Sequence, residues 1–73
     1  MPQLGRTKWF NREHGFGFIA PDDGGPDLYL GCADVLASGI RHLPRGQRVE
    51  FEIIVGTKGP QAHRLRLVHS RYA

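Results

Sequence analysis

Turn-forming residues divide the chain into short segments and leave little room for long helices. Ten glycines and five prolines are spread over 73 residues, and many of them gather in the connections DDGGP, PRGQ and GTKGP. Glycine reaches positive φ angles without strain and proline fixes φ, so both residues favour turns. We therefore expect short strands, with at most one or two turns of helix in ADVLASGI.

Five segments carry the apolar–polar alternation that is typical of a half-buried strand. The clearest is VEFEIIV, in which Val49, Phe51 and Ile53 alternate with Glu50 and Glu52. Five short strands protect their edges most economically by closing into a barrel. The sequence therefore predicts an all-β fold, a five-stranded antiparallel barrel, with strands at residues 5–11, 16–21, 27–31, 49–55 and 62–68.

The length of the chain indicates one small domain, residues 1–73, with a core at about 5–68 and a frayed tail at 69–73. A chain of this size buries only about 60% of its unfolded surface, so its stability margin is thin. No apolar run approaches the roughly 18–20 residues of a membrane span, and no signal segment is evident. The single cysteine excludes an internal disulfide framework. We expect a cytoplasmic monomer without a membrane partner.

Positive charge is concentrated in two parts of the chain. The formal net charge is +3, and residues 41–48 contain Arg41, Arg45 and Arg48 without any acid. The same holds from Lys58 to the end of the chain. Basic surface of this kind attracts polyanions such as nucleic acid, although it also serves simply to keep a protein in solution.

Aromatic residues cluster near the N-terminus, at Trp9, Phe10, Phe16 and Phe18. In the segment FGFIAP, side chains alternate between faces, so Phe16 and Phe18 share one face and Ile19 takes the other. Periodicity alone leaves open which face is the core. The aliphatic residues are sufficient to fill a small barrel, which favours outward-pointing rings. The predicted interior is then Ile19, Leu28, Leu30, Val49, Phe51 and Ile53.

The same alternation places Tyr29 on the outer face with Phe16 and Phe18. Gly15 and Gly17 flank these rings, and glycine lets another backbone or a ligand approach closely. We therefore expect a partner to approach the backbone here.

Five ordered blocks resemble the bacterial cold-shock protein family: KWFN, GFGFI, PDDGG, GQRVEFE and KGPQA. The resemblance covers residues 5 to about 68, in family order and at family spacing. It implies a five-stranded antiparallel OB-type barrel that binds single-stranded RNA or DNA. The implied function is that of an RNA chaperone or a regulator of transcription or translation.

The resemblance also implies which residues bind nucleic acid. Rings stack on bases of any identity, at about 1–3 kcal/mol per base, while basic side chains hold the backbone. His14 replaces a family lysine and Arg64 a family asparagine. Arg41 is added for its charge and not from the resemblance. The expected binding residues are Lys8, Trp9, Phe10, Asn11, His14, Phe16, Phe18, Asp27, Tyr29, Arg41, Lys58, Gln61 and Arg64.

The second family motif is degenerate in this chain. It reads LYLGC, so that Gly31 replaces the family histidine and Cys32 the following phenylalanine, while Ile40 replaces an aromatic residue. Three stacking groups are therefore missing. We expect a shorter footprint and weaker binding, with Arg41 and Arg64 partly replacing stacking by charge.

Two other classes of function receive less support. The histidines and Cys32 lack the paired spacing of a zinc site, and no catalytic arrangement is evident, so we predict neither metal, cofactor nor enzyme activity. Cys32 is expected to be a small packed side chain.

The alternative to nucleic-acid binding is a protein-interaction module that uses LYLGC and Ile40 as an aliphatic patch. The retained Lys8, Trp9 and phenylalanines favour nucleic acid.

Overall fold

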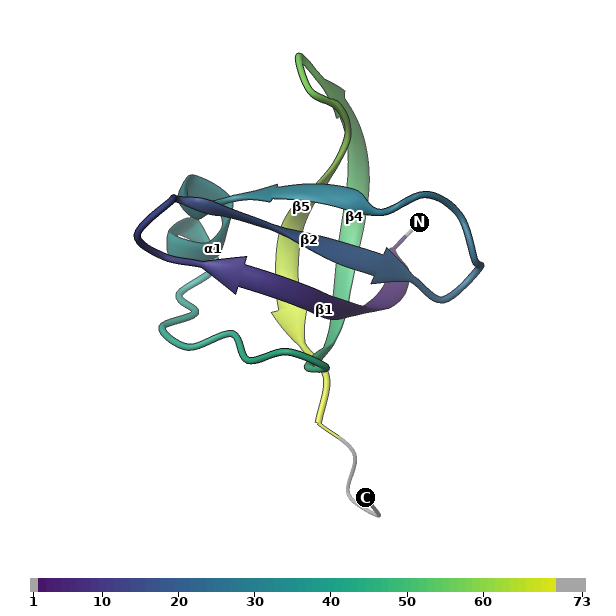
Figure 1. The fold of residues 1–73 in the computed structure, drawn as a ribbon. Coiled ribbons are helices and arrows are strands. Elements are labelled where there is room, and N and C mark those ends of the chain that lie inside the picture. Colours follow the sequence, from purple (N-terminus) through teal and green to yellow (C-terminus); the bar gives the residue numbers. More distant parts are fainter. Residues whose placement is uncertain (1, 70–73) are drawn as a thin grey trace.

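A computed structural model describes residues 2–69, so the tail predicted at 69–73 lies outside the described residues except for His69. Five strands and one short helix make up the fold (Figure 1). The strand pairs β1–β2 and β4–β5 cross each other in Figure 1, and α1 lies at one end of the barrel. The elements are β1 (Gln3–Asn11), β2 (Phe16–Pro21), β3 (Leu28–Gly31), α1 (Cys32–Ala37), β4 (Arg48–Gly56) and β5 (Gly59–Leu67).

The strands close into a barrel in the order β1-β2-β3-β5-β4. The predicted five-stranded barrel is confirmed, but it is not purely antiparallel. Four neighbouring pairs are antiparallel, whereas β3 and β5 run parallel, with Tyr29 opposite Gln61. The reason is geometric: strand directions cannot alternate all the way around a closed ring of five, so at least one pair must be parallel.

Aliphatic side chains fill the interior, as the alternation predicted. Ile19, Leu30, Val49 and Phe51 are completely buried, and Leu28 is almost so. The prediction for Ile53 was wrong, since this side chain is 43% exposed. Phe51 is the last residue of β4 that pairs with β1. Beyond it, β4 continues with β5 into a hairpin that projects from the barrel (Figure 1).

The end of the barrel near α1 is closed by residues that the strand pattern did not include. Val35 of α1 is buried, as are Ile40 and Leu43 of the following loop. Ile40 is only 7% exposed, so it belongs to the core and not to a surface patch. The predicted short helix is confirmed at Cys32–Ala37.

Arg64 occupies a strained backbone conformation in β5. Its φ is 55°, and it is the only non-glycine residue with positive φ among the described residues. It lies where the register between β4 and β5 shifts by one residue, between the pairs Glu50–Arg66 and Glu52–His63. One type of β-bulge places a residue in the left-handed region, a conformation that costs most L-residues about 1–2 kcal/mol and that asparagine tolerates better.

Replacing Arg64 with asparagine is therefore expected to raise the free energy of unfolding by about 0.5–1 kcal/mol. Chemical denaturation would measure the change. Arg64→Ala is the matched control, because it removes the same charge but keeps the strain, and it should bring no comparable gain. Equal stabilities of the two variants would show that the backbone at this bulge is not strained.

Candidate nucleic-acid interface

Four aromatic rings lie next to one another on the outer face of three adjacent strands. Trp9 of β1 is opposite Phe18 of β2, and Phe18 is opposite Tyr29 of β3. Phe16 lies two positions before Phe18 and so shares its face. All four side chains are only partly buried, which confirms the prediction that Phe16, Phe18 and Tyr29 point away from the core.

The rings hold one another in place. The centroid of Trp9 is 5.4 Å from those of both Phe16 and Phe18, in edge-to-face geometry. Phe16 and Tyr29 are stacked, with centroids 5.9 Å apart and planes 15° apart. Phe18 meets Tyr29 edge-on at 6.2 Å. Contacts of this kind restrict ring rotation, so the surface is preorganised before any ligand arrives. We call these four rings the aromatic platform.

Two lysines flank the aromatic platform. Lys8 Nζ lies 2.8 Å from Asp27 Oδ2 in an ion pair whose side chains are 56% and 38% exposed. An exposed pair of this kind is worth about 0–1 kcal/mol, so Lys8 can exchange Asp27 for a phosphate at little cost. Lys58 Nζ lies 5.4 Å from the centre of the Tyr29 ring, within cation–π range. The platform is therefore bordered by positive charge.

The tight connection between β1 and β2 is organised by Asn11. Its side-chain Oδ1 accepts a hydrogen bond from the backbone N–H of His14 at 3.0 Å, and its carbonyl accepts one from Gly15 at 2.9 Å. Asn11 therefore has a structural role besides the binding role that was predicted for it. The exposed imidazole of His14 lies 6.5 Å from the Phe16 ring, at the border of the platform.

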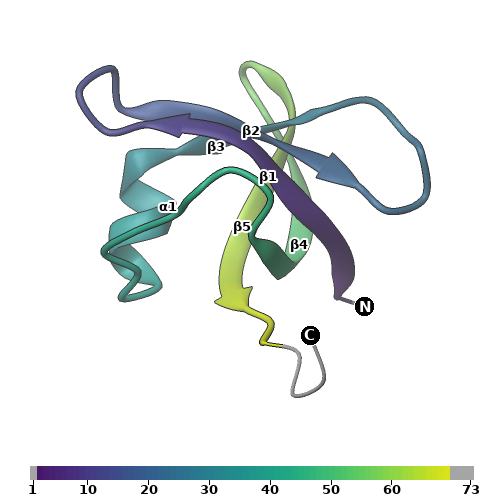
Figure 2. The same cartoon turned by 60° about the horizontal axis from the view of Figure 1, so that its bottom comes forward.

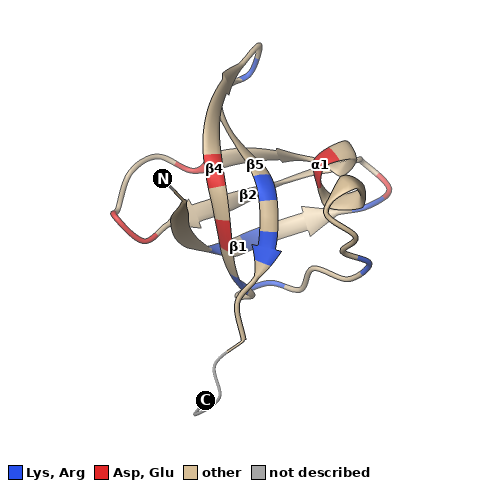
Figure 3. Cartoon of the chain, turned by 180° about the vertical axis from the view of Figure 1, so that it is seen from behind, with Lys and Arg blue, Asp and Glu red and all other residues tan. Residues whose placement is uncertain are grey.

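Four further predicted binding residues belong neither to the platform nor to the polar border described above. Phe10 packs against the hydrophobic core. Gln61 donates a hydrogen bond from Nε2 to Asp34 at 3.3 Å. Arg64 of β5 lines a separate surface cavity with Glu50 and Glu52. Figure 3, seen from behind, shows the basic residues of β5 beside the acidic residues of β4. Arg41 lies in the loop after α1 and lines a cavity with Trp9.

Gly17 serves the fold and not the approach of a ligand. It is buried, and a Cβ added there would lie 2.2 Å from the carbonyl oxygen of Trp9 and 2.6 Å from Cα of Phe10. The backbone that approaches closely is therefore β1 itself. Gly15, with a φ of 80°, supplies the left-handed conformation that ends the β1–β2 turn.

Asp34 was missed in the sequence because it lies in the predicted helix, away from every motif. Its carboxylate bonds Gln61 and lies 2.8 Å from Nδ1 of His63. It thereby joins α1 to β5 beside the closing parallel strand pair. The only sign of this role in the sequence was the presence of a carboxylate near the middle of a short, otherwise apolar helix.

A closed five-stranded barrel with a short helix between its third and fourth strands is an OB-type barrel, and clustered rings bordered by lysines are typical of OB-type barrels that bind single strands. The model of the "Cold-shock" DNA-binding domain matches residues 3–68. The chain therefore belongs to the cold-shock domain family, as the resemblance implied.

Named relatives agree with this assignment. The chain is 50% identical over 68 residues to "Probable cold shock protein A" of Mycolicibacterium smegmatis, covering 93% of this chain and 100% of the relative. It is 52% identical over 61 residues to "Cold shock protein ScoF" of Streptomyces coelicolor, covering 84% and 91%. It is 50% identical over 58 residues to "Cold shock-like protein CspE" of Escherichia coli, covering 80% and 84%.

A solved structure supports the fold. The chain resembles "drosophila Unr CSD456" with a TM-score of 0.78 and 22% identity, over 100% of this chain and 29% of that one. Within residues 2–69, no group of three His, Cys, Asp or Glu residues is arranged to hold a metal ion. In the same part of the chain, no helix has the length and apolar character needed to span a membrane.

Proposed function

We propose that the protein binds single-stranded RNA or DNA by stacking bases on Trp9, Phe16, Phe18 and Tyr29. The observation that carries this function is the aromatic platform itself, four adjacent rings on an outer face with Lys8 and Lys58 beside them. Every base has a flat face, so stacking requires no particular sequence, while lysines neutralise the phosphates. Asp27, Asn11 and His14 complete the polar border of this surface.

The protein acts as an RNA chaperone by capturing bases that are transiently unpaired. Binding of the open strand, and not of the paired one, shifts the equilibrium towards the open form by mass action, so neither ATP nor a cofactor is needed. The family is described by DNA binding and not by a reaction, and we propose no enzymatic step. The cellular setting that fits this role is the cytoplasm, with the protein acting as a monomer.

Salt-dependent binding of single strands tests this function. Fluorescence anisotropy would compare a labelled single-stranded 12-mer, as RNA and as DNA, with the duplex of the same sequence. The single strands should bind, the duplex should not, and affinity should fall steeply as salt rises because counterions are released from phosphates. Equal binding of the duplex, or an affinity that does not change with salt concentration, would contradict the proposal.

The structure removes one residue from the surface patch that was predicted for the alternative function, a protein-interaction module. It relied on Ile40 as part of an exposed aliphatic patch, but Ile40 is buried in the core. That alternative also gives no reason for the aromatic platform and the lysines beside it. We therefore propose nucleic-acid binding alone.

The shortened platform leads to a prediction about affinity. Restoring the two family residues with the double variant Gly31→His/Cys32→Phe should tighten binding of a single strand about 10-fold, because each new ring offers a stack worth about 1–3 kcal/mol. The site accepts a side chain, since a Cβ at Gly31 would lie 3.5 Å from the Tyr29 ring, an ordinary contact.

A matched control for this variant is Gly31→Leu/Cys32→Leu, which adds apolar volume without rings. Titration of a labelled octanucleotide would compare both variants with the wild type. If the leucine variant tightens binding as much as the ring variant, or if neither does, the missing stacking groups do not limit affinity.

A further inference from the structure

A basic cavity lies beside the aromatic platform, between β1 and the loop that connects α1 to β4. Its volume is about 330 Å³, and Trp9 and Phe10 form part of its wall. Arg12 follows β1 at one side, and the loop contributes Arg41 and Arg45 at the other. No carboxylate lines this cavity. Three arginines and an apolar wall therefore line one cavity.

Hydrogen bonds hold the loop against β1, so the cavity is a fixed part of the fold. The backbone N–H of Thr7 donates to the carbonyl of Gln47 at 2.9 Å, and the N–H of Gly46 donates to the carbonyl of Thr7 at 2.7 Å. Figure 2 shows this loop passing beside β1. The pairing of β1 with β4 ends at Arg6, so the loop, and with it Arg45, occupies the next part of the β1 edge.

The three arginines have no ionic partners among residues 2–69. The ion pairs of this part of the chain involve Lys8, Arg48, Arg66 and His63, each with its own carboxylate. Like charges around a shared cavity repel one another, and an anion between them removes that repulsion. The arrangement therefore favours an anionic ligand.

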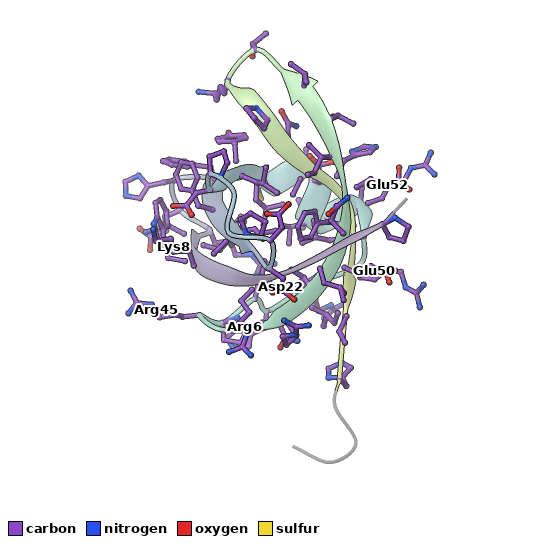
Figure 4. All side chains as sticks on the ribbon, turned by 90° about the vertical axis from the view of Figure 1, so that its right-hand side faces the viewer. Arg6, Lys8, Asp22, Arg45, Glu50 and Glu52 are labelled. Atoms are coloured by element: carbon purple, nitrogen blue, oxygen red, sulfur yellow. The ribbon has the colours of Figure 1, made fainter. Side chains whose placement is uncertain are left out.

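The cavity is continuous with the platform through Trp9. A second cavity, of about 460 Å³, is lined by Arg6 and Lys8 and shares Trp9 and Arg45 with the first. Lys8 and Arg45 extend to the same side of the molecule in Figure 4. A strand stacked on Trp9 therefore has basic side chains on both sides of that ring.

We propose that Arg12, Arg41 and Arg45 form a phosphate-binding groove that takes the backbone of a single-stranded nucleic acid beyond its base on Trp9. This inference rests on the proposed function and extends it: Arg41 was expected to bind, whereas Arg12 and Arg45 are new. Guanidinium groups present several donors in a planar fork that matches phosphate oxygens. The groove adds affinity without sequence preference, which offsets part of the stacking lost at Gly31 and Cys32.

The variant Arg45→Gln tests this groove. Binding of oligothymidine with eight nucleotides would be titrated at several salt concentrations for the wild type, Arg45→Gln, Arg45→Lys and Arg66→Gln. Arg66 is the matched control, because its loss changes the net charge equally but it lies on β5 beside Glu50, at 3.5 Å. Circular dichroism would verify that all four proteins are folded.

We expect Arg45→Gln to weaken binding about 3- to 5-fold at low salt and to reduce the slope of log K against log salt by about 0.7, the value for one phosphate contact on a single strand. Arg45→Lys should retain most of the slope, and Arg66→Gln should match the wild type. A wild-type slope and affinity in Arg45→Gln, or equal losses in Arg45→Gln and Arg66→Gln, would overturn the groove while leaving the proposed function intact. Absence of salt-dependent binding by the wild type would overturn both.

Discussion

Replacing Phe18 with alanine is expected to weaken binding of a single-stranded octanucleotide by about 10- to 100-fold, because a base stack is worth about 1–3 kcal/mol. Phe18 is the central ring of the platform, with centroids of Trp9, Phe16 and Tyr29 between 5.4 and 6.2 Å away. Its removal deletes one stacking surface and also the contacts that orient its neighbours. Titration of a labelled oligonucleotide would measure the loss.

Two controls separate stacking from general effects of the substitution. Phe18→Tyr keeps the ring and should bind within a few fold of the wild type. Val55→Ala removes apolar surface from the β4–β5 hairpin, where Val55 is 86% exposed, and should leave affinity unchanged. If folded Phe18→Ala binds as tightly as Phe18→Tyr, the rings do not form the binding surface.

Replacing Gly17 with alanine is expected to lower the free energy of unfolding by about 3 kcal/mol, at the upper end of typical overpacking costs. The added Cβ would meet two backbone atoms of β1, the carbonyl oxygen of Trp9 and Cα of Phe10. A side chain could relieve such a contact by changing its rotamer, but backbone atoms cannot, so β1 and β2 must separate. A domain of this size has a total stability of only about 4–11 kcal/mol, and chemical denaturation would reveal the loss.

Gly24→Ala is the matched control for Gly17→Ala. Gly24 has a φ of 81° and no heavy atom within 4 Å of the position that a Cβ would take. Its replacement should therefore cost only the strain of a left-handed alanine, about 1–2 kcal/mol. If Gly17→Ala is no more destabilising than Gly24→Ala, the close approach of β1 and β2 does not require glycine.

The strands were predictable because their alternation is strong and their turns are rich in glycine and proline. The predicted and observed strands agree to within three residues at every end. Alternation describes which side of a strand a residue takes, but not whether another strand covers that side. Ile53 follows the alternation of Val49 and Phe51 and is nevertheless 43% exposed, because β4 no longer pairs with β1 beyond Phe51.

The platform was predictable for the same reason, since cross-strand neighbours follow from alternation once the interior is known. Contacts made through the α1–β4 loop and through the helix were not predictable. Arg45 reaches the region of Trp9 because the α1–β4 loop is bonded to Thr7, and Gln61 is held by Asp34 of the helix. These residues are distant in sequence, and no local pattern connects them. Ile40 was misplaced for a related reason, because its loop folds inwards to close the barrel.

Quenching of Trp9 fluorescence by a short oligothymidine or oligouridine, repeated over a salt series, tests the central claim most directly. Trp9 is the only tryptophan of the chain, and its ring lies within the aromatic platform. Stacking of bases on the platform predicts saturable quenching that weakens as salt rises. An unchanged Trp9 signal at high micromolar oligonucleotide would contradict binding on these rings.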